Sequence, residues 1–293
     1  MSLFMSANVS PPRSSCRCWR PLGLLALVLL VGASGCASSG EGDANVTYSL
    51  TAKQNYEKGQ QELKEENFIE ASRFFTFVKQ KFPFSRYAVL SELALADTRF
   101  AREAYQEAID SYTTFARLHP THERVEDGYV AYRIAQCYYR EMPGDWFLMP
   151  PGHEKDQSAV RDAYRELSDF LDKFPDSEHA DEVVKMRRDV MGRLIEHEVY
   201  VARFYLETGH PKAAILRIQG AISRYPESGR EAELLLVLGR THLEMGNPLS
   251  AQQTFQRVVE EYGPDLQAKR AQLYLQFIRE RYGERPKDRP THG

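Results

Sequence analysis

The feature that most constrains the fold is a proline turn that recurs five times along the chain. The copies read KFPFSRYA at 81–88, LHPTHERV at 118–125, KFPDSEHA at 173–180, RYPESGRE at 224–231 and, more weakly, EYGPDLQA at 261–268. Proline cannot continue the hydrogen bonding of a helix, and it disfavours helical conformation in the residue before it. The recurrence therefore predicts five helices that each end in the same kind of turn.

The stretch before each turn has the periodicity of a helix. Each stretch opens on an alanine, with a larger side chain four residues later and an apolar one after seven, a spacing that marks one helix face. Twelve positions before three of these alanines lies a small residue (Gly59, Ala202 or Gly239), which lets a second helix approach closely. Each unit is therefore predicted to be two helices joined by a turn. The repeated alanines are Ala71, Ala108, Ala163, Ala214 and Ala251.

The unit resembles the tetratricopeptide repeat, which has small residues near its eighth and twentieth positions, an aromatic residue near the twenty-fourth and proline near the thirty-second. One helix pair cannot bury its apolar face alone, so such units stack on one another. The sequence predicts an all-α fold: a tetratricopeptide-like right-handed solenoid of five helix pairs, with a C-terminal capping helix at 265–283. An unrelated helical bundle is the alternative.

The alanines are unevenly spaced, at 37, 55, 51 and 37 residues. The first excess falls at about 141–157 and predicts an inserted loop that carries apolar side chains such as Trp146. The second falls in 177–209, which contains no proline. This stretch predicts one long helix of roughly 30 residues, ~45 Å at the usual helical rise.

Short signals also mark the turns. Gly209 and Gly246 are suited to end the first helix of a pair, and Pro211 and Pro248 to begin the second. A hydroxyl residue after each of the four clearest proline turns is predicted to cap the helix that follows. These residues are Ser85, Thr121, Ser177 and Ser228.

The first 35 residues differ from the rest. They contain three arginines and no acidic residue, and an apolar run at 22–31 is followed by Ala33-Ser34-Gly35-Cys36. This order is typical of a secretory signal, and small residues before a cysteine resemble a bacterial lipobox. We expect cleavage before Cys36 and lipidation of that cysteine, with an ordinary signal peptide or an uncleaved anchor as alternatives. An Asp directly after the lipidated cysteine resembles the signal that retains Gram-negative lipoproteins in the inner membrane. Residue 37 is Ala, and the absence of this signal indicates the outer membrane.

The predicted organisation has five parts. They are a lipoprotein signal peptide at 1–35, a flexible linker from Cys36 at 36–49, an N-terminal half of three repeats at 50–176, a C-terminal half of two repeats plus the capping helix at 177–283, and a disordered tail at 284–293. Loss of the signal leaves 35 of the 38 basic residues against 41 acidic ones, a net charge of −6. A mildly acidic chain has no general attraction for nucleic acid, so we expect no nucleic-acid partner.

The sequence carries no catalytic constellation. His197-Glu198 is not part of an H-E-x-x-H motif because residue 201 is Val, and no phosphate-binding glycine loop is present. His119 and His122 flank a proline, where a capped turn is favoured over metal ligation. Cys137 is the only thiol that remains beside Cys36, so no internal disulfide is expected. We therefore expect no enzymatic activity, cofactor or metal.

Helical repeats commonly bind proteins or peptides, and aromatic side chains are concentrated in the first three units. Tyrosine offers a large, rigid contact area, although most of these rings are expected to pack between helices. Arg133, among the tyrosines, either meets a carboxylate or is a surface cation. Arg217 interrupts the apolar AAILRIQGAIS and must reach solvent or an anionic partner. The aromatic residues are Tyr87, Phe100, Tyr105, Tyr129, Tyr132, Tyr138 and Tyr139.

The repeats, the inserted loop and the long helix together resemble the BamD family of lipoproteins in the β-barrel assembly machinery. The resemblance covers about 50–265. Its most specific stretches are FPFSRYAVLSELALAD, RLHPTHERVEDGYVAYRIAQCYY, DQSAVRDAYRELSDFLDKFPDSEHA and HEVYVARFYLETGHPKAAILRIQGAISRYPES. The stretch GDWFLMPPG in the inserted loop departs from the family pattern.

This resemblance implies a non-enzymatic scaffold that is lipid-anchored in the cell outer membrane and faces the periplasm. Its partners would be a BamA-like barrel subunit, bound through POTRA domains, other Bam lipoproteins, and unfolded outer-membrane proteins that it helps to recruit. The resemblance assigns partner binding to Arg217 in LRIQG and substrate binding to Tyr87 and Arg133. The alternative function is a periplasmic adaptor lipoprotein of the cell-envelope or division machinery, of the Tol-Pal type.

Overall fold

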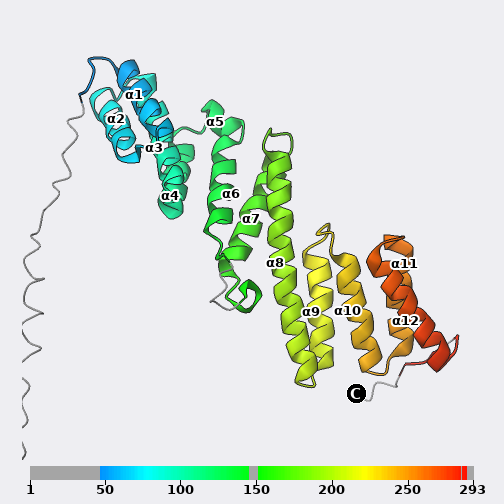
Figure 1. Ribbon diagram of the computed structural model, residues 1–293. Helices are drawn as coiled ribbons and strands as arrows, with labels where there is room; N and C mark the ends of the chain where they lie inside the picture. The colour runs from blue at the N-terminus through cyan, green and yellow to red at the C-terminus, as the bar shows by residue number, and fades with distance from the viewer. Residues whose placement is uncertain (1–46, 145–150, 285, 289–293) are drawn as a thin grey trace, which may run out of the picture. The chain divides into compact units, whose positions relative to one another are not determined.

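The computed structural model describes residues 47–144, 151–284 and 286–288, and within these ranges the chain forms only helices (Figure 1). Twelve are α-helices and one, η1, is a short 3₁₀ helix. Their bounds are α1 Ala52–Lys64, α2 Phe68–Lys81, α3 Arg86–Ala101, α4 Tyr105–Leu118, α5 Glu123–Glu126, α6 Tyr129–Glu141, η1 Gly152–Glu154, α7 Ser158–Lys173, α8 Ala180–Glu207, α9 Pro211–Arg224, α10 Glu231–Glu244, α11 Pro248–Tyr262 and α12 Leu266–Tyr282. The all-α prediction is confirmed.

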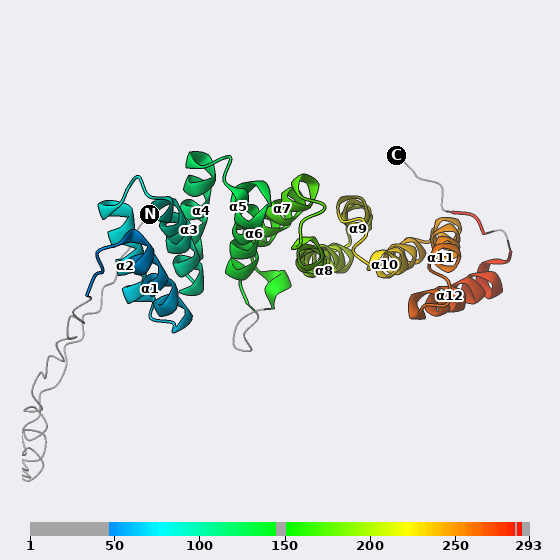
Figure 2. The same cartoon turned by 90° about the horizontal axis from the view of Figure 1, so that it is seen from above.

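The helices pack in sequential pairs. The pairs are α1 with α2, α3 with α4, α6 with α7, α8 with α9 and α10 with α11, and α12 covers the last pair by packing on α11. Figure 2 shows the same succession of helices from a second direction. Five pairs and a terminal helix were expected, but the four-residue helix α5 was not. It forms in the LHPTHERV turn and packs on α6.

The repeated alanine and the bulky side chain four residues after it form the core of each pair. All five alanines, together with Phe75 of the first pair and Phe255 of the last, are fully buried. A methyl group on Gly59 would lie 2.7 Å from the Phe75 ring, and one on Gly239 would lie 2.5 Å from the Phe255 ring. The absence of a side chain at these glycines is therefore what lets the two helices of the pair approach.

The predicted turn residues are largely confirmed. Gly209 and Gly246 adopt φ angles of 78° and 74°, in the left-handed region that favours glycine, and Pro211 and Pro248 open α9 and α11. Ser85 caps α3, because its hydroxyl oxygen accepts a hydrogen bond from the Tyr87 N–H.

The other predicted caps need correction. Thr121 does not cap a helix: the ring nitrogen Nδ1 of His122 accepts from the Arg124 N–H at the start of α5. The hydroxyls of Ser177 and Ser228 accept from the backbone N–H two residues on. Neither serine is the cap of a helix, because α8 and α10 begin three residues after Ser177 and Ser228, and both serines therefore lie in the preceding turn.

The long helix is confirmed, since α8 runs for 28 residues without interruption. Of the inserted loop, η1 packs against α8, where the His153 carbonyl lies 2.7 Å from Nδ1 of His197. Trp146 and its apolar neighbours lie outside the described residues, as do Cys36 and the predicted signal peptide. Among the described helices, none combines the length and the apolar character needed to cross a membrane.

Both predicted flexible ends are partly ordered. Ser49, assigned to the linker, exchanges two hydrogen bonds of 2.8 Å with the buried side chain of Asn55. Asp288, assigned to the disordered tail, accepts hydrogen bonds from the Leu249 and Ser250 N–H groups at the start of α11. A carboxylate stabilises a helix N-terminus by binding its free N–H groups, which explains why this part of the tail is held.

Candidate partner-binding sites

Arg217 lies on α9 and reaches a carboxylate on the neighbouring helix α8. Its Nη1 atom lies 3.4 Å from Oε2 of Glu198, and Nη2 of Arg224 lies 3.1 Å from Oε1 of the same side chain. Glu198 is only 5% exposed, so it is a buried carboxylate compensated by two guanidinium groups. The sequence left open whether Arg217 reaches solvent or an anion, and the structure supplies an anion from within the chain.

Glu198 was missed as a partner of Arg217, although the sequence contains a signal for it. It lies three residues after Ile195 and four before Ala202, both fully buried, so it occupies a core position of α8. A lone carboxylate at such a position must find a cation. The pairing with α9 itself was out of reach, because it depends on the register between two helices.

The surface beside Arg217 is partly apolar. Ile218 points into the core, whereas Leu216, on the other side of Arg217, is 70% exposed. The side chain of Arg217 retains 42% of its exposure. Because a guanidinium has five N–H donors, Arg217 can hold Glu198 and still donate hydrogen bonds to an outside acceptor.

Arg133, on α6, lies in an internal network in the N-terminal half. Its guanidinium stacks 4.0 Å above the Phe100 ring, Nε donates to the Tyr129 hydroxyl at 3.2 Å, and Nη1 donates to the side-chain oxygen Oε1 of Gln136 at 2.9 Å. Oδ1 of Asp97, on α3, lies 3.8 Å from Nε. Arg133 is therefore part of this internal network, with its side chain only 22% exposed, rather than the surface cation considered from the sequence.

Asp97 is the centre of the network. Its Oδ1 atom accepts hydrogen bonds from the hydroxyls of Tyr112 at 2.6 Å and Tyr129 at 2.8 Å. Burial and the nearby Asp97 charge raise the pKa of both tyrosines above the ordinary value, so both remain protonated donors. The network thus joins α3, α4 and α6.

A second branch of the network reaches the long helix α8. Gln136 donates to the Tyr132 hydroxyl at 2.9 Å, and this hydroxyl donates to Oε2 of Glu182 on α8, also at 2.9 Å. Burial and the bond to Glu182 raise the pKa of Tyr132 to about 12. The ring of His179 stacks on Tyr132 with the centroids 3.9 Å apart. The aromatic residues of this region therefore serve largely to pack and connect helices.

Tyr87 lies outside this network. Its ring lies 5.6 Å from the ring of Tyr56 on α1, and its hydroxyl accepts a hydrogen bond from Nη2 of Arg86 at 3.0 Å. The structure thus places the two predicted substrate-binding residues, Tyr87 and Arg133, in separate sets of contacts.

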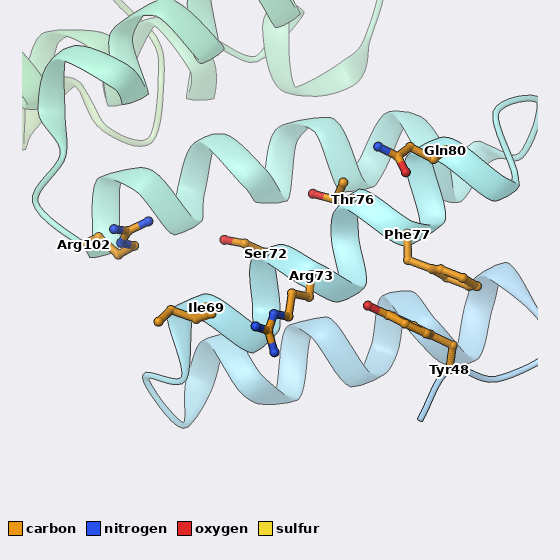
Figure 3. Close-up of a pocket in the computed structure, with 8 residues that line it drawn as sticks. All are labelled: Tyr48, Ile69, Ser72, Arg73, Thr76, Phe77, Gln80 and Arg102. Carbon is orange, nitrogen blue, oxygen red and sulfur yellow. The ribbon is translucent and has the colours of Figure 1, made fainter. Parts of the chain in front are cut away.

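Figure 3 shows a third feature, a groove along α2. Tyr48 stacks on Phe77 at one end, with ring centroids 4.0 Å apart, and Arg102 lies toward the other end. Ile69, which is 59% exposed, adds an apolar surface to a cavity of about 400 Å³. This groove was not expected from the sequence, because Tyr48 had been assigned to the linker.

The two histidines of the second proline turn have different contacts. Nε2 of His119 lies 2.8 Å from Oε2 of Glu92, while His122 caps α5. Among the residues with described positions, no group of three His, Cys, Asp or Glu side chains is arranged to hold a metal ion. Cys137 is buried, and burial raises the pKa of its thiol to about 12, which makes it a poor nucleophile.

Comparison with known proteins gives the class of this protein. Residues 49–279 match the family model YfiO, described as an outer membrane lipoprotein. The chain therefore belongs to this family of outer membrane lipoproteins.

The curated relatives narrow the class, since they bear the name outer membrane protein assembly factor BamD. The relative from Neisseria meningitidis serogroup A is 28% identical over 249 residues, which cover 82% of this chain and 91% of the relative. Those from Caulobacter vibrioides and Vibrio cholerae are 26% and 25% identical and cover 78% and 76% of this chain, and 72% and 90% of the relatives. The BamD resemblance predicted from the sequence is confirmed.

Among solved structures, the TPR2AB domain of yeast Sti1 in a complex with pHSP90 aligns with a TM-score of 0.42 and 11% identity. The alignment covers 78% of this chain and 83% of that one.

Proposed function

We propose that the protein is a non-enzymatic scaffold of the outer-membrane β-barrel assembly complex. It binds a BamA-like barrel subunit through the POTRA domains of that subunit, and it helps to recruit unfolded outer-membrane proteins. In this proposal Cys36 carries the lipid that holds the protein at the periplasmic face of the outer membrane, where other Bam lipoproteins are further partners. The family match over 49–279 and the relatives named as assembly factors support this function.

The position of Arg217 is the single observation on which the proposed binding of the barrel subunit rests. It lies in the LRIQG stretch, on which the resemblance bases partner binding, and it is half exposed although it is bound to the buried Glu198. A planar cation held in one orientation beside the exposed Leu216 is suited to an acidic protein surface with an apolar contact at its edge.

We assign Tyr87 and Arg133 a role in the binding of unfolded substrate. Tyr87 is half-buried against Tyr56, so part of its ring is open to an extended peptide. Arg133 holds Tyr129 by a hydrogen bond and Phe100 by stacking, so it contributes to substrate binding mainly by fixing the positions of these two rings.

A pull-down from outer membranes tests both the binding of the barrel subunit and the binding of unfolded substrate. The tagged protein should co-purify a BamA-like barrel, and Arg217→Glu should lose most of this barrel because it places a carboxylate where a cation is needed. The matched control is Arg257→Glu on α11, whose arginine is about equally exposed and forms an ion pair with Glu261 one turn away. Tyr87→Ala should retain the barrel and capture less unfolded substrate.

Equal recovery of the barrel with Arg217→Glu and with wild type would contradict the partner-site assignment. Recovery of cell-wall or division proteins in place of a barrel would instead support the adaptor function of the Tol-Pal type.

A further inference from the structure

The Glu198 site contains one more cation than burial of the carboxylate requires. A buried carboxylate needs an opposite charge, and a single arginine supplies it. Here Oε2 faces Arg217 and Oε1 faces Arg224, so the three side chains together carry one net positive charge. Both guanidinium groups also remain open to solvent, with 42% and 51% of their side-chain surface exposed.

The path of the Arg224 side chain depends on Gly220. Nε of Arg224 donates to the Gly220 carbonyl oxygen at 3.1 Å, so the side chain runs back along α9 toward Glu198. A methyl group on Gly220 would lie 3.1 Å from Nη2 of Arg224 and 3.8 Å from Nε. A side chain at position 220 would therefore make a tight contact with the guanidinium, and Arg224 would have to shift by a few tenths of an ångström from the position in which it faces Glu198.

We propose that Arg217 and Arg224 form one two-cation binding site for an acidic protein surface, and that Glu198 and Gly220 are positioning residues that hold the pair together. The inference rests on the proposed function, and it adds three residues to the site that Arg217 was expected to form alone. Carboxylates are the fitting ligands, because each guanidinium is planar and can bind a carboxylate through two N–H donors.

In this proposal, Glu198 and Gly220 orient the two arginine side chains before a partner binds. Free arginine side chains lose conformational freedom when a partner binds them, which weakens association. Glu198 restricts both side chains before the partner arrives, and Gly220 lets Arg224 adopt the required path. Removal of either positioning residue should therefore weaken binding even though both arginines remain.

The test measures the affinity of the full-length protein for the purified POTRA domains of its BamA-like partner. Gly220→Ala should weaken binding by about 3- to 10-fold, in the range found for coupled neighbouring residues. It should not lower the folding stability, because alanine is the better helix former. Glu198→Gln should weaken binding to a similar extent, and Glu198→Asp, which keeps the charge, should weaken it less.

The decisive control is the Arg224→Ala background. There Gly220→Ala should change the affinity by less than about twofold, because the side chain that it would shift is gone. Equal losses in both backgrounds, or wild-type affinity of Gly220→Ala and Glu198→Gln, would overturn the positioning inference. If wild type binds and Arg217→Glu does not, the proposed function stands whatever these variants do. If wild type fails to bind the POTRA domains at all, the proposed function falls, and the inference with it.

Discussion

At single positions, glycine sets the distance between paired helices. Gly59 and Gly239 face the rings of Phe75 and Phe255 at distances that leave no room for a methyl group. Gly192, in the middle of α8, differs, since the nearest atom to a methyl group there is Nη1 of Arg230 at 4.0 Å. The same amino acid thus has a packing role at two positions and none at the third.

This difference predicts opposite effects of the same substitution. Gly239→Ala should lower the free energy of unfolding by about 1–3 kcal/mol, because the added methyl group overpacks the contact with Phe255. Gly192→Ala is the matched control and should raise this free energy by about 0.5–1 kcal/mol, since alanine favours the helix and nothing obstructs it. Urea unfolding followed by circular dichroism measures both values. A loss of stability in both variants would show that the Phe255 contact is not the cause.

At the scale of the helices, the C-terminal tail contributes to the last pair. Asp288 binds the first N–H groups of α11 and lies close enough to the partly buried His242 for their charges to interact. Partial burial raises the pKa of Asp288, but the hydrogen bonds from Ser250 and Leu249 outweigh it and lower this pKa below the ordinary value. The ionised carboxylate is therefore the form that holds the tail.

Asp288→Ala should lower the free energy of unfolding by about 1 kcal/mol at neutral pH, as for the loss of a helix cap. A carboxyl group whose pKa is lowered by folding stabilises the protein above its unfolded pKa of about 3.9, and this stabilisation is lost as the pH falls through the folded value. The difference between wild type and Asp288→Ala should thus persist at pH 5 and shrink below about pH 4. Lys287→Ala, at an exposed neighbouring residue, is the control. A difference that does not change with pH would contradict the role of the charge.

The sequence predicts the features that recur within each repeat, but it does not predict the contacts that form between helices. The alanines, the glycines of the inner turns and the length of α8 follow from local periodicity and turn chemistry. The contacts between helices in the Asp97 network, the Glu198 pairing and the capping by Asp288 join residues whose separation in sequence ranges from 15 to 50, so they depend on how helices align. For the same reason the internal partners of Arg133 and Arg217 could not be predicted from the sequence.

For the whole molecule, the attachment to the membrane is predicted to depend on one residue before the helical repeats. The lipobox-like sequence ends at Cys36, which is the residue predicted to carry the lipid. An acyl chain contributes about 0.8 kcal/mol per buried CH₂ group, so several chains on one cysteine give a stable anchor.

Cys36→Ser should abolish labelling with radioactive palmitate and release the full-length protein from the membrane fraction after a high-salt wash. Serine cannot carry the thioether-linked lipid, whereas Cys16→Ser and Cys18→Ser, in the segment predicted to be removed, should leave labelling unchanged. A Cys36→Ser protein that stays in the washed membranes would show that another part of the chain attaches it.

The continuity of α8 fixes the geometry between two of the sites described above. Glu182, which ends the Arg133 network, and Glu198, which holds Arg217, are 16 residues apart on this one helix and hence about 24 Å apart along its axis. A helix advances about 1.5 Å and turns about 100° with each residue. A single inserted or deleted residue between the two glutamates would therefore rotate one site against the other by more than a quarter turn while barely changing the distance. A change in the length of α8 between the two glutamates would keep the two sites in phase only if it came close to a whole number of helical turns.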